Sequence, residues 1–138
     1  NDIDKEIEKE LGIKISDIFE TRGEVYFRSI EEKITLKTLK KNNIVVSLGG
    51  GSFLNSNIKK EVLKNHISFW LKWNTKTLIN RIKNNKKRPI AYKANVNELI
   101  EIIKKRSFIY SNAIYKIQCE NCTKNEIVNK VLEIYENH

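Results

Sequence analysis

The spacing of apolar residues predicts helices along most of the chain. Ile3, Ile7 and Leu11 recur on one helical face ahead of Gly12, which predicts a short helix over residues 4–11 with a glycine C-cap. A second amphipathic run, with Ser16 as its expected N-cap, leads to Gly23 and then to a long helix over about 24–41. Further helices are expected at 57–64, 75–84, 96–110 and 124–135.

Three runs with a different pattern predict strands. Residues 44–48 are apolar and β-branched and end abruptly at Gly49, Gly50 and Gly51, which is typical of a buried strand that opens into a glycine loop. Residues 67–73 and 114–119 predict two more strands. Because strands alternate with helices, the pattern indicates an α/β fold with a parallel sheet. A doubly wound sheet usually has more strands than this, so the sheet is expected to be incomplete.

Composition narrows the class of protein. The chain has 138 residues, 40% hydrophobic and 31% charged, which fits one globular domain. No apolar run approaches the roughly 20 residues that cross a bilayer, and no secretory leader opens the chain. We therefore expect a cytoplasmic protein with no membrane partner. The net charge of +9 would suit nucleic acid, but the lysines are scattered over every segment, so we expect no nucleic-acid partner.

Two cysteines close together could bind metal or undergo redox chemistry. Cys119 and Cys122 have the spacing of half a zinc site or of a redox pair. The chain contains no second cysteine pair, so we expect neither role.

Several polar residues lie where open α/β sheets bind ligands, beyond the carboxyl ends of strands. Asp2 and Asp4 could hold Mg²⁺ or a hydroxyl group, or could cap a helix. Arg28 and Glu31 could form an ordinary ion pair on a helix surface. Arg106 could clamp a carboxylate. The glycine run can bring its N–H groups close to a ligand or form a tight turn, and it is not a Walker A loop because no Gly-Lys-Ser or Gly-Lys-Thr follows.

A polar and basic segment at about 84–95 holds the only proline and predicts a loop of the length typical of lids. Its Lys86, Lys87 and Arg88 could close over phosphate groups or form a solvated run of charge.

The order of these motifs resembles that of the shikimate kinases. The matching residues are Asp2-x-Asp4, Gly23-Glu24, Phe27-Arg28, Glu31, Gly49-Gly50-Gly51, Arg88-Pro89, and Arg106 with Tyr110 and Ala113. The resemblance covers residues 2 to about 115. It implies a single domain over 1–138, with a three-layer αβα architecture, a parallel sheet of strand order 2-3-1-4-5 and a substrate-binding region at about 3–32.

The resemblance also implies roles for individual residues. Asp2 would help hold the Mg²⁺ of ATP through water, and Asp4 would meet ring hydroxyls of shikimate and assist deprotonation of the attacking one. Arg28 and Arg106 would grip the shikimate carboxylate, and Glu31 would orient Arg28 and reach a hydroxyl.

The remaining implied contacts involve the apolar wall, the glycine loop and the nucleotide. Phe19 and Phe27 would form the apolar wall, and Gly49, Gly50 and Gly51 would contact the substrate. Arg88, from the lid, would reach the transferring phosphoryl group, whereas Arg81 would stack on adenine. Asn121, Cys122 and Thr123 would lie near the adenine.

The function implied is ATP-dependent phosphorylation of the shikimate 3-hydroxyl, giving shikimate 3-phosphate and ADP, in chorismate and aromatic amino acid biosynthesis. The resemblance implies a monomer. Two alternatives stay open: a non-catalytic relative that has lost ATP binding, and a kinase of another small polyhydroxy acid.

The chain departs from the family pattern at its start. Shikimate kinases have a strand and a Gly-x-x-Gly-x-Gly-Lys-Ser or Thr loop before the Asp pair, and this chain begins at the pair itself. We expect it to be a truncated form of a longer enzyme, without the central first strand and the phosphate loop, and to be unstable and inactive alone.

Overall fold

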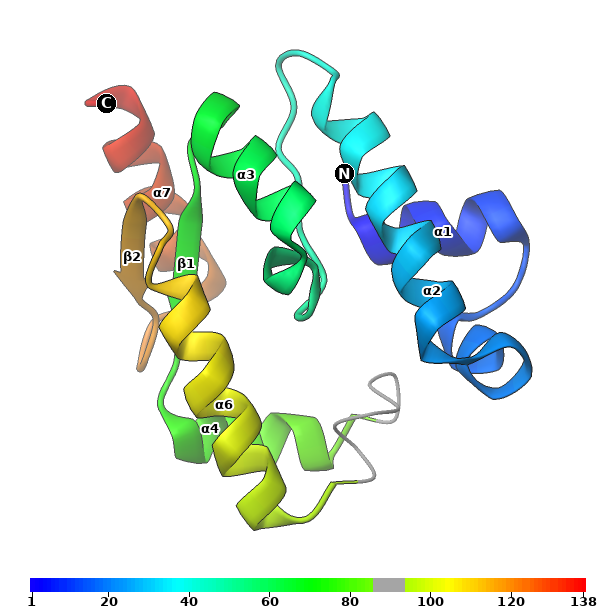
Figure 1. Ribbon diagram of the computed structural model, residues 1–138. Helices are drawn as coiled ribbons and strands as arrows, with labels where there is room; N and C mark the ends of the chain where they lie inside the picture. The colour runs from blue at the N-terminus through cyan, green and yellow to red at the C-terminus, as the bar shows by residue number, and fades with distance from the viewer. Residues whose placement is uncertain (86–93) are drawn as a thin grey trace.

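The computed structural model describes residues 1–85 and 94–138, and Figure 1 shows their arrangement. The predicted α/β class is confirmed, and each predicted helix is present. The elements in chain order are α1 (Ile3–Leu11), α2 (Ile15–Leu39), the 3-10 helix η1 (Ser52–Leu54), α3 (Ser56–Asn65), β1 (Phe69–Lys72), α4 (Thr75–Lys83), α6 (Val96–Tyr110), β2 (Tyr115–Gln118) and α7 (Lys124–Glu136). No helix in these two ranges is both long and apolar enough to cross a membrane.

Glycines end α1 and interrupt α2 where the pattern predicted breaks. Gly12 follows α1 with a left-handed φ of 70°, and its N–H donates to the Glu8 carbonyl. Gly23 lies inside α2 with φ 84° and ψ 173°, so the helix is kinked there. The expected Ser16 cap is wrong. The N-cap is Lys14, and the carboxylate of Glu8 accepts the N–H of Ile15 at 3.1 Å.

The largest core cluster joins the first two helices. Ile3 and Ile7 of α1 pack with Ile18, Phe27 and Ile34 of α2, and all five are buried. A second buried cluster joins the end of α2 to η1 and α3; its members are Leu39, Phe53, Ile58 and Val62. Val46 and Leu48 pack against both clusters. The segment before the glycine run is thereby fixed between them.

The sheet is small and parallel. β1 and β2 pair in the register Phe69–Tyr115 to Lys72–Gln118, and α7 packs against β2. α4 and α6 lie side by side below the sheet in Figure 1, where Leu99 packs with Ile79 and Ile82.

The predicted strand at 44–48 is wrong. Within this segment only Ser47 pairs with another backbone segment, in an isolated bridge. It pairs with Asp2 in the parallel sense: Ser47 accepts the N–H of Ile3 at 3.1 Å and donates to the Asn1 carbonyl at 2.8 Å. A β-strand needs a neighbouring backbone segment with which to form hydrogen bonds. Within residues 1–85 and 94–138, only the first residues of the chain pair with this segment in that way. Among the described residues, no hydrogen bond joins this segment to β1. The predicted five-strand order stays a prediction.

Candidate active site

Asp2 and Asp4 begin α1 on either side of its first residue. One oxygen of the Asp2 carboxylate, Oδ1, accepts the N–H of Asp4 at 3.0 Å and that of Lys5 at 3.4 Å, so the helix-capping role is confirmed. The bridge to Ser47 places this turn beside the glycine run. Asp4 Oδ1 lies 3.1 Å from the position that a Cβ on Gly49 would occupy.

The glycine run is crowded by polar side chains. Glu31 Oε2 and Ser52 Oγ lie 3.3 and 3.5 Å from the Cβ position of Gly49. The carbonyl of Gly50 accepts the hydroxyl of Tyr110 from α6. At Gly51, a Cβ would lie 2.5 Å from Arg28 Nη1. The backbone of Gly51, with φ −99° and ψ −9°, suits any residue. A side chain at Gly51 would therefore displace the guanidinium of Arg28 from its present position.

Arg28 and Glu31 form a close ion pair on α2. Arg28 Nη1 donates to Glu31 Oε1 at 2.8 Å, and the Glu31 side chain is only 3% exposed. Glu24 lies 3.7 Å from Arg28 Nε. The guanidinium is thus held by carboxylates while 30% of its side chain stays accessible. An arginine fixed in this way can present its remaining N–H groups to an anion.

Arg28 and Arg106 line the same cavity. It has a volume of about 290 Å³, near the lower end of the range for small-molecule sites. Its lining residues are Glu24, Arg28, Gly51, Leu54, Asn55 and Arg106. The two guanidinium groups come from different helices, α2 and α6. Tertiary structure therefore brings together the two residues that sequence reasoning assigned to a carboxylate.

Phe19 and Phe27 lie together, as the resemblance implied, but in the core. Their ring centroids are 4.7 Å apart, and Phe27 is buried. The Phe27 ring also lies 5.3 Å from the Cζ of Arg28. Neither phenylalanine is among the residues that line the cavity. Phe27 therefore packs in the core beside Arg28, and the substrate-wall role stays a prediction.

Arg81 stacks on an aromatic residue of its own chain. Its Cζ lies 3.9 Å from the ring centroid of Trp73, which follows β1. Nearby, Glu120 reaches from the turn after β2 to the start of α4, where it accepts the Asn74 N–H at 3.0 Å and the Thr77 hydroxyl at 2.7 Å. These hydrogen bonds, aided by the charge of Arg81, hold the pKa of Glu120 below its ordinary value. The predicted catalytic Arg88, like most of the expected lid, lies outside the described residues.

Whether Mg²⁺ fits this site depends on the acidic residues around Asp2. Within residues 1–85 and 94–138, no group of three or more His, Cys, Asp or Glu side chains could hold a metal ion. The cap bonds involve one carboxylate oxygen of Asp2. Asp2 therefore suits a contact through water, with the remaining ligands coming from a nucleotide and from solvent.

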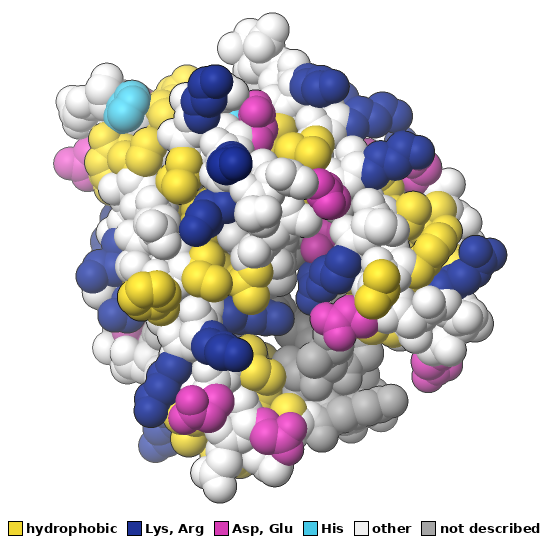
Figure 2. Space-filling view, in the orientation of Figure 1, with side chains coloured by type: hydrophobic (Ala, Val, Ile, Leu, Met, Phe, Trp, Pro, Cys, Tyr) yellow, Lys and Arg dark blue, Asp and Glu magenta, His cyan; other side chains and the backbone are white. Residues whose placement is uncertain are grey.

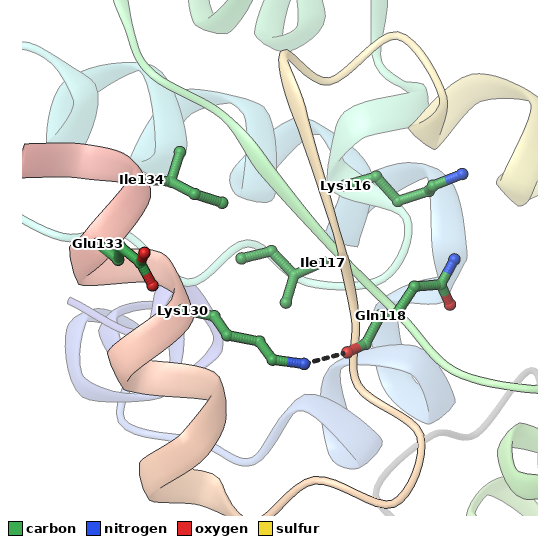
Figure 3. Close-up of a pocket in the computed structure, with 6 residues that line it drawn as sticks. All are labelled: Lys116, Ile117, Gln118, Lys130, Glu133 and Ile134. Carbon is green, nitrogen blue, oxygen red and sulfur yellow. Dashed lines mark hydrogen bonds between the residues drawn. The ribbon is translucent and has the colours of Figure 1, made fainter. Parts of the chain in front are cut away.

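A second cavity, shown in Figure 3, lies between β2 and α7. It also measures about 290 Å³ and is lined by Lys116, Ile117, Gln118, Lys130, Glu133 and Ile134. Lys130 Nζ donates to the Gln118 carbonyl at 3.2 Å. This cavity contains no residue of the predicted site, so the candidate chemistry belongs to the cavity lined by the two arginines.

Sequence reasoning gave no role to Ser52, Leu54, Asn55 or Tyr110. Ser52 and Leu54 belong to η1, which directly follows the glycine run, and Asn55 caps α3 through its side chain. For Ser52, Leu54 and Asn55, the position directly after the glycine run is the sequence feature that could have indicated a role in the site. The contact between Tyr110 and Gly50 spans 60 residues and needed the fold.

Comparison with known proteins gives one consistent result. A family model described as shikimate kinase matches residues 1–136. The shikimate kinase of Persephonella marina is 40% identical over 131 residues, which is 95% of this chain and 79% of that protein. The shikimate kinase of Bartonella henselae is 34% identical over 132 residues, again 95% of this chain but 63% of its own length. The chain therefore spans less than two thirds of the length of that relative.

Solved structures agree with the sequence relatives. A shikimate kinase from Acinetobacter baumannii, solved in complex with shikimate, has a TM-score of 0.91 and 25% identity over 99% of this chain and 77% of its own. The shikimate kinase of Aquifex aeolicus has a TM-score of 0.83 and 29% identity, covering 99% of this chain and 80% of its own.

Proposed function

The chain belongs to the shikimate kinase family, and on that premise we propose that its gene product transfers the terminal phosphoryl group of ATP to the 3-hydroxyl of shikimate. The observation that carries this proposal is the cavity that both Arg28 and Arg106 line, with the glycine run at its edge. Two arginines from different helices suit a small carboxylate, because each guanidinium can donate two parallel hydrogen bonds.

The residues beside this cavity supply the rest of the proposed chemistry. Glu31 holds Arg28 in place, and Asp4 and Glu31 both lie beside the Cβ position of Gly49. In the proposed reaction the 3-hydroxyl oxygen bonds to the γ-phosphorus, the bond from phosphorus to the leaving ADP breaks, and Asp4 accepts the hydroxyl proton. Gly49, Gly50 and Gly51 would contact shikimate, and Phe19 and Phe27 would back its site.

The nucleotide contacts are proposed on the family pattern. Arg81 would leave or share its stack on Trp73 to meet adenine. Arg88 would reach the transferring phosphoryl group, and Asp2 would hold Mg²⁺ through water. Mg²⁺ would neutralise charge on the phosphate oxygens.

A coupled assay of ADP release tests the proposal directly. The gene product that contains these residues should release ADP from ATP when shikimate is added, and much more slowly with quinate. The methyl ester of shikimate, which lacks the carboxylate charge, should bind at least tenfold more weakly by calorimetry. Equal turnover of quinate would favour a kinase of another polyhydroxy acid. Shikimate binding without ADP release would favour the non-catalytic alternative.

The same assay addresses the expectation that residues 1–138 are inactive alone. These residues contain no Gly-Lys-Ser or Gly-Lys-Thr sequence with which to cradle the phosphates. A sample of residues 1–138 that releases no ADP when shikimate is added would support this expectation, and one that releases ADP would refute it.

The proposed enzyme is a cytoplasmic monomer that binds neither membrane nor nucleic acid. Figure 2 supports the last point, because its Lys and Arg side chains are spread over the visible face rather than gathered in one stripe. Gel filtration would test whether the enzyme is a monomer, and an oligonucleotide binding assay at low salt would test whether it binds nucleic acid.

A further inference from the structure

Trp73, in the turn that follows β1, takes no part in the proposed reaction. The Cζ of Arg81 lies 3.9 Å from the centroid of its indole ring. The other cations that lie over aromatic rings in the described residues are 5.1–5.4 Å from the ring centroids. A separation of 3.9 Å is a van der Waals contact, so the guanidinium of Arg81 rests on the face of the indole.

This ring is the contact that holds the guanidinium of Arg81. In the part of the chain that the structure describes, no hydrogen bond and no ion pair within 4 Å involves Arg81. Arg81 is nevertheless an exposed residue, whereas Trp73 is half-buried. The N–H donors of the guanidinium are thus not taken up by acceptors in that part of the chain.

Glu120 fixes the backbone that carries this pair. Its carboxylate accepts the N–H of Asn74 at 3.0 Å and the hydroxyl of Thr77 at 2.7 Å. It therefore joins the residue next to Trp73 to α4, the helix that carries Arg81. Thr77 and Arg81 lie four residues apart, which places them on the same face of α4. The indole and the guanidinium are thereby held together before a ligand binds.

A guanidinium that rests on an indole suits a second planar ring. One face is covered by the indole, and a π-system such as a purine base can stack on the other face. A free arginine side chain loses much rotamer freedom when a ligand fixes it. An arginine that is already held loses less, and preorganisation of this kind strengthens binding.

We propose that Trp73 is a positioning residue of the nucleotide site: its indole holds the guanidinium of Arg81 so that adenine stacks on the opposite face and the contact with Trp73 is kept. The stack with adenine rests on the proposed function, whereas the contact between Trp73 and Arg81 in the free protein does not. If adenine instead displaced the indole, removal of the ring would strengthen ATP binding.

Kinetics of the gene product test the positioning role. Trp73→Leu removes the aromatic ring and keeps an apolar side chain. We expect KM for ATP to rise about two- to fivefold, the effect of losing one exposed cation–π contact, with KM for shikimate and kcat little altered. Trp73→Phe, which keeps a ring, should restore most of the loss. A KM for ATP that stays unchanged or falls in Trp73→Leu would overturn the proposal.

Tyr26→Leu is the matched control for this change. The Cζ of Arg22 lies 5.1 Å from the Tyr26 ring on α2, so the variant also removes an aromatic ring beneath an exposed arginine. Tm should fall slightly and KM for ATP should stay constant. An equal rise of KM for ATP in both variants would show that lost stability is the cause, and would refute the positioning role.

NMR of the gene product without nucleotide tests the contact itself. The ring current of Trp73 should shift the side-chain protons of Arg81 upfield, and Arg81→Lys identifies these signals by their loss. Trp73→Leu should return them to the position of an ordinary exposed arginine, and no change would refute the contact. If the gene product binds no ATP, the proposed function and the positioning role fail together, and the NMR result still decides the contact.

Discussion

The guanidinium of Arg28 lies against the Cα of Gly51, so close that a Cβ there would be 2.5 Å from Nη1 and 2.6 Å from Nη2. A side chain at this position would force the guanidinium to shift. The contact joins α2 to the end of the glycine run and fixes one of the two cations of the candidate site.

Replacing Gly51 with alanine should therefore displace Arg28. We expect Gly51→Ala to weaken shikimate binding at least tenfold by calorimetry, a loss of about 1.4 kcal/mol or more. Stability should change little, because the backbone at Gly51 suits any residue.

Gly12→Ala is the matched control for this change. Gly12 has φ 70°, and no described atom lies within 4 Å of its Cβ position. Its replacement should cost about 1 kcal/mol of stability through backbone strain and leave shikimate binding intact. Wild-type affinity in Gly51→Ala would contradict the assignment of Arg28.

The charge of Glu31 should matter for both stability and binding. Glu31→Gln keeps the shape but removes the buried partner of Arg28, which is itself partly exposed. We expect the free energy of unfolding in urea to fall by about 1 kcal/mol, and shikimate affinity to fall with it. Glu101→Gln breaks an exposed pair with Lys104, so it should change neither quantity. Equal effects of the two changes would show that the Arg28–Glu31 pair is an ordinary surface contact.

Tyr110 should hold the glycine run in place. Tyr110→Phe keeps the ring but removes the hydroxyl that donates to the Gly50 carbonyl. Loss of one such bond costs about 1 kcal/mol. The change should lower Tm slightly and raise KM for shikimate several-fold, while KM for ATP stays constant. A rise confined to KM for ATP would show that Gly50 does not border the shikimate site.

Glu120 should stabilise the fold only while it is ionised. Its pKa is lowered in the folded state, first by the N–H of Asn74 and then by the Thr77 hydroxyl. Its contribution is therefore fully present above the ordinary carboxyl pKa and is lost as pH falls through the lowered pKa. Glu120→Gln should lower Tm slightly at neutral pH, and the difference from wild type should shrink under acid conditions. Melting curves across pH check this, and a difference that grows toward acid pH would contradict it.

Local sequence determined most of the helices and their ends. The period of Ile3, Ile7 and Leu11 specified α1, and Gly12 and Gly23 marked its end and the kink in α2, because only glycine adopts these positive φ values at little cost. These features depend on neighbours in the chain. The resemblance to shikimate kinases also selected Arg28, Glu31 and Arg106 from sequence alone.

Tertiary structure decided the strands and the contacts of the site. Residues 44–48 have a strand composition, yet only Ser47 forms a bridge, because a strand requires a partner backbone that composition does not supply. Which carboxylates face Gly49, and that Ser52 joins them, depends on how α1, α2 and η1 pack. The meeting of Arg28 with Arg106 depends likewise on α2 and α6. Contacts between residues far apart in the chain follow from the packing of whole elements, and local sequence pattern carries no information about those distances.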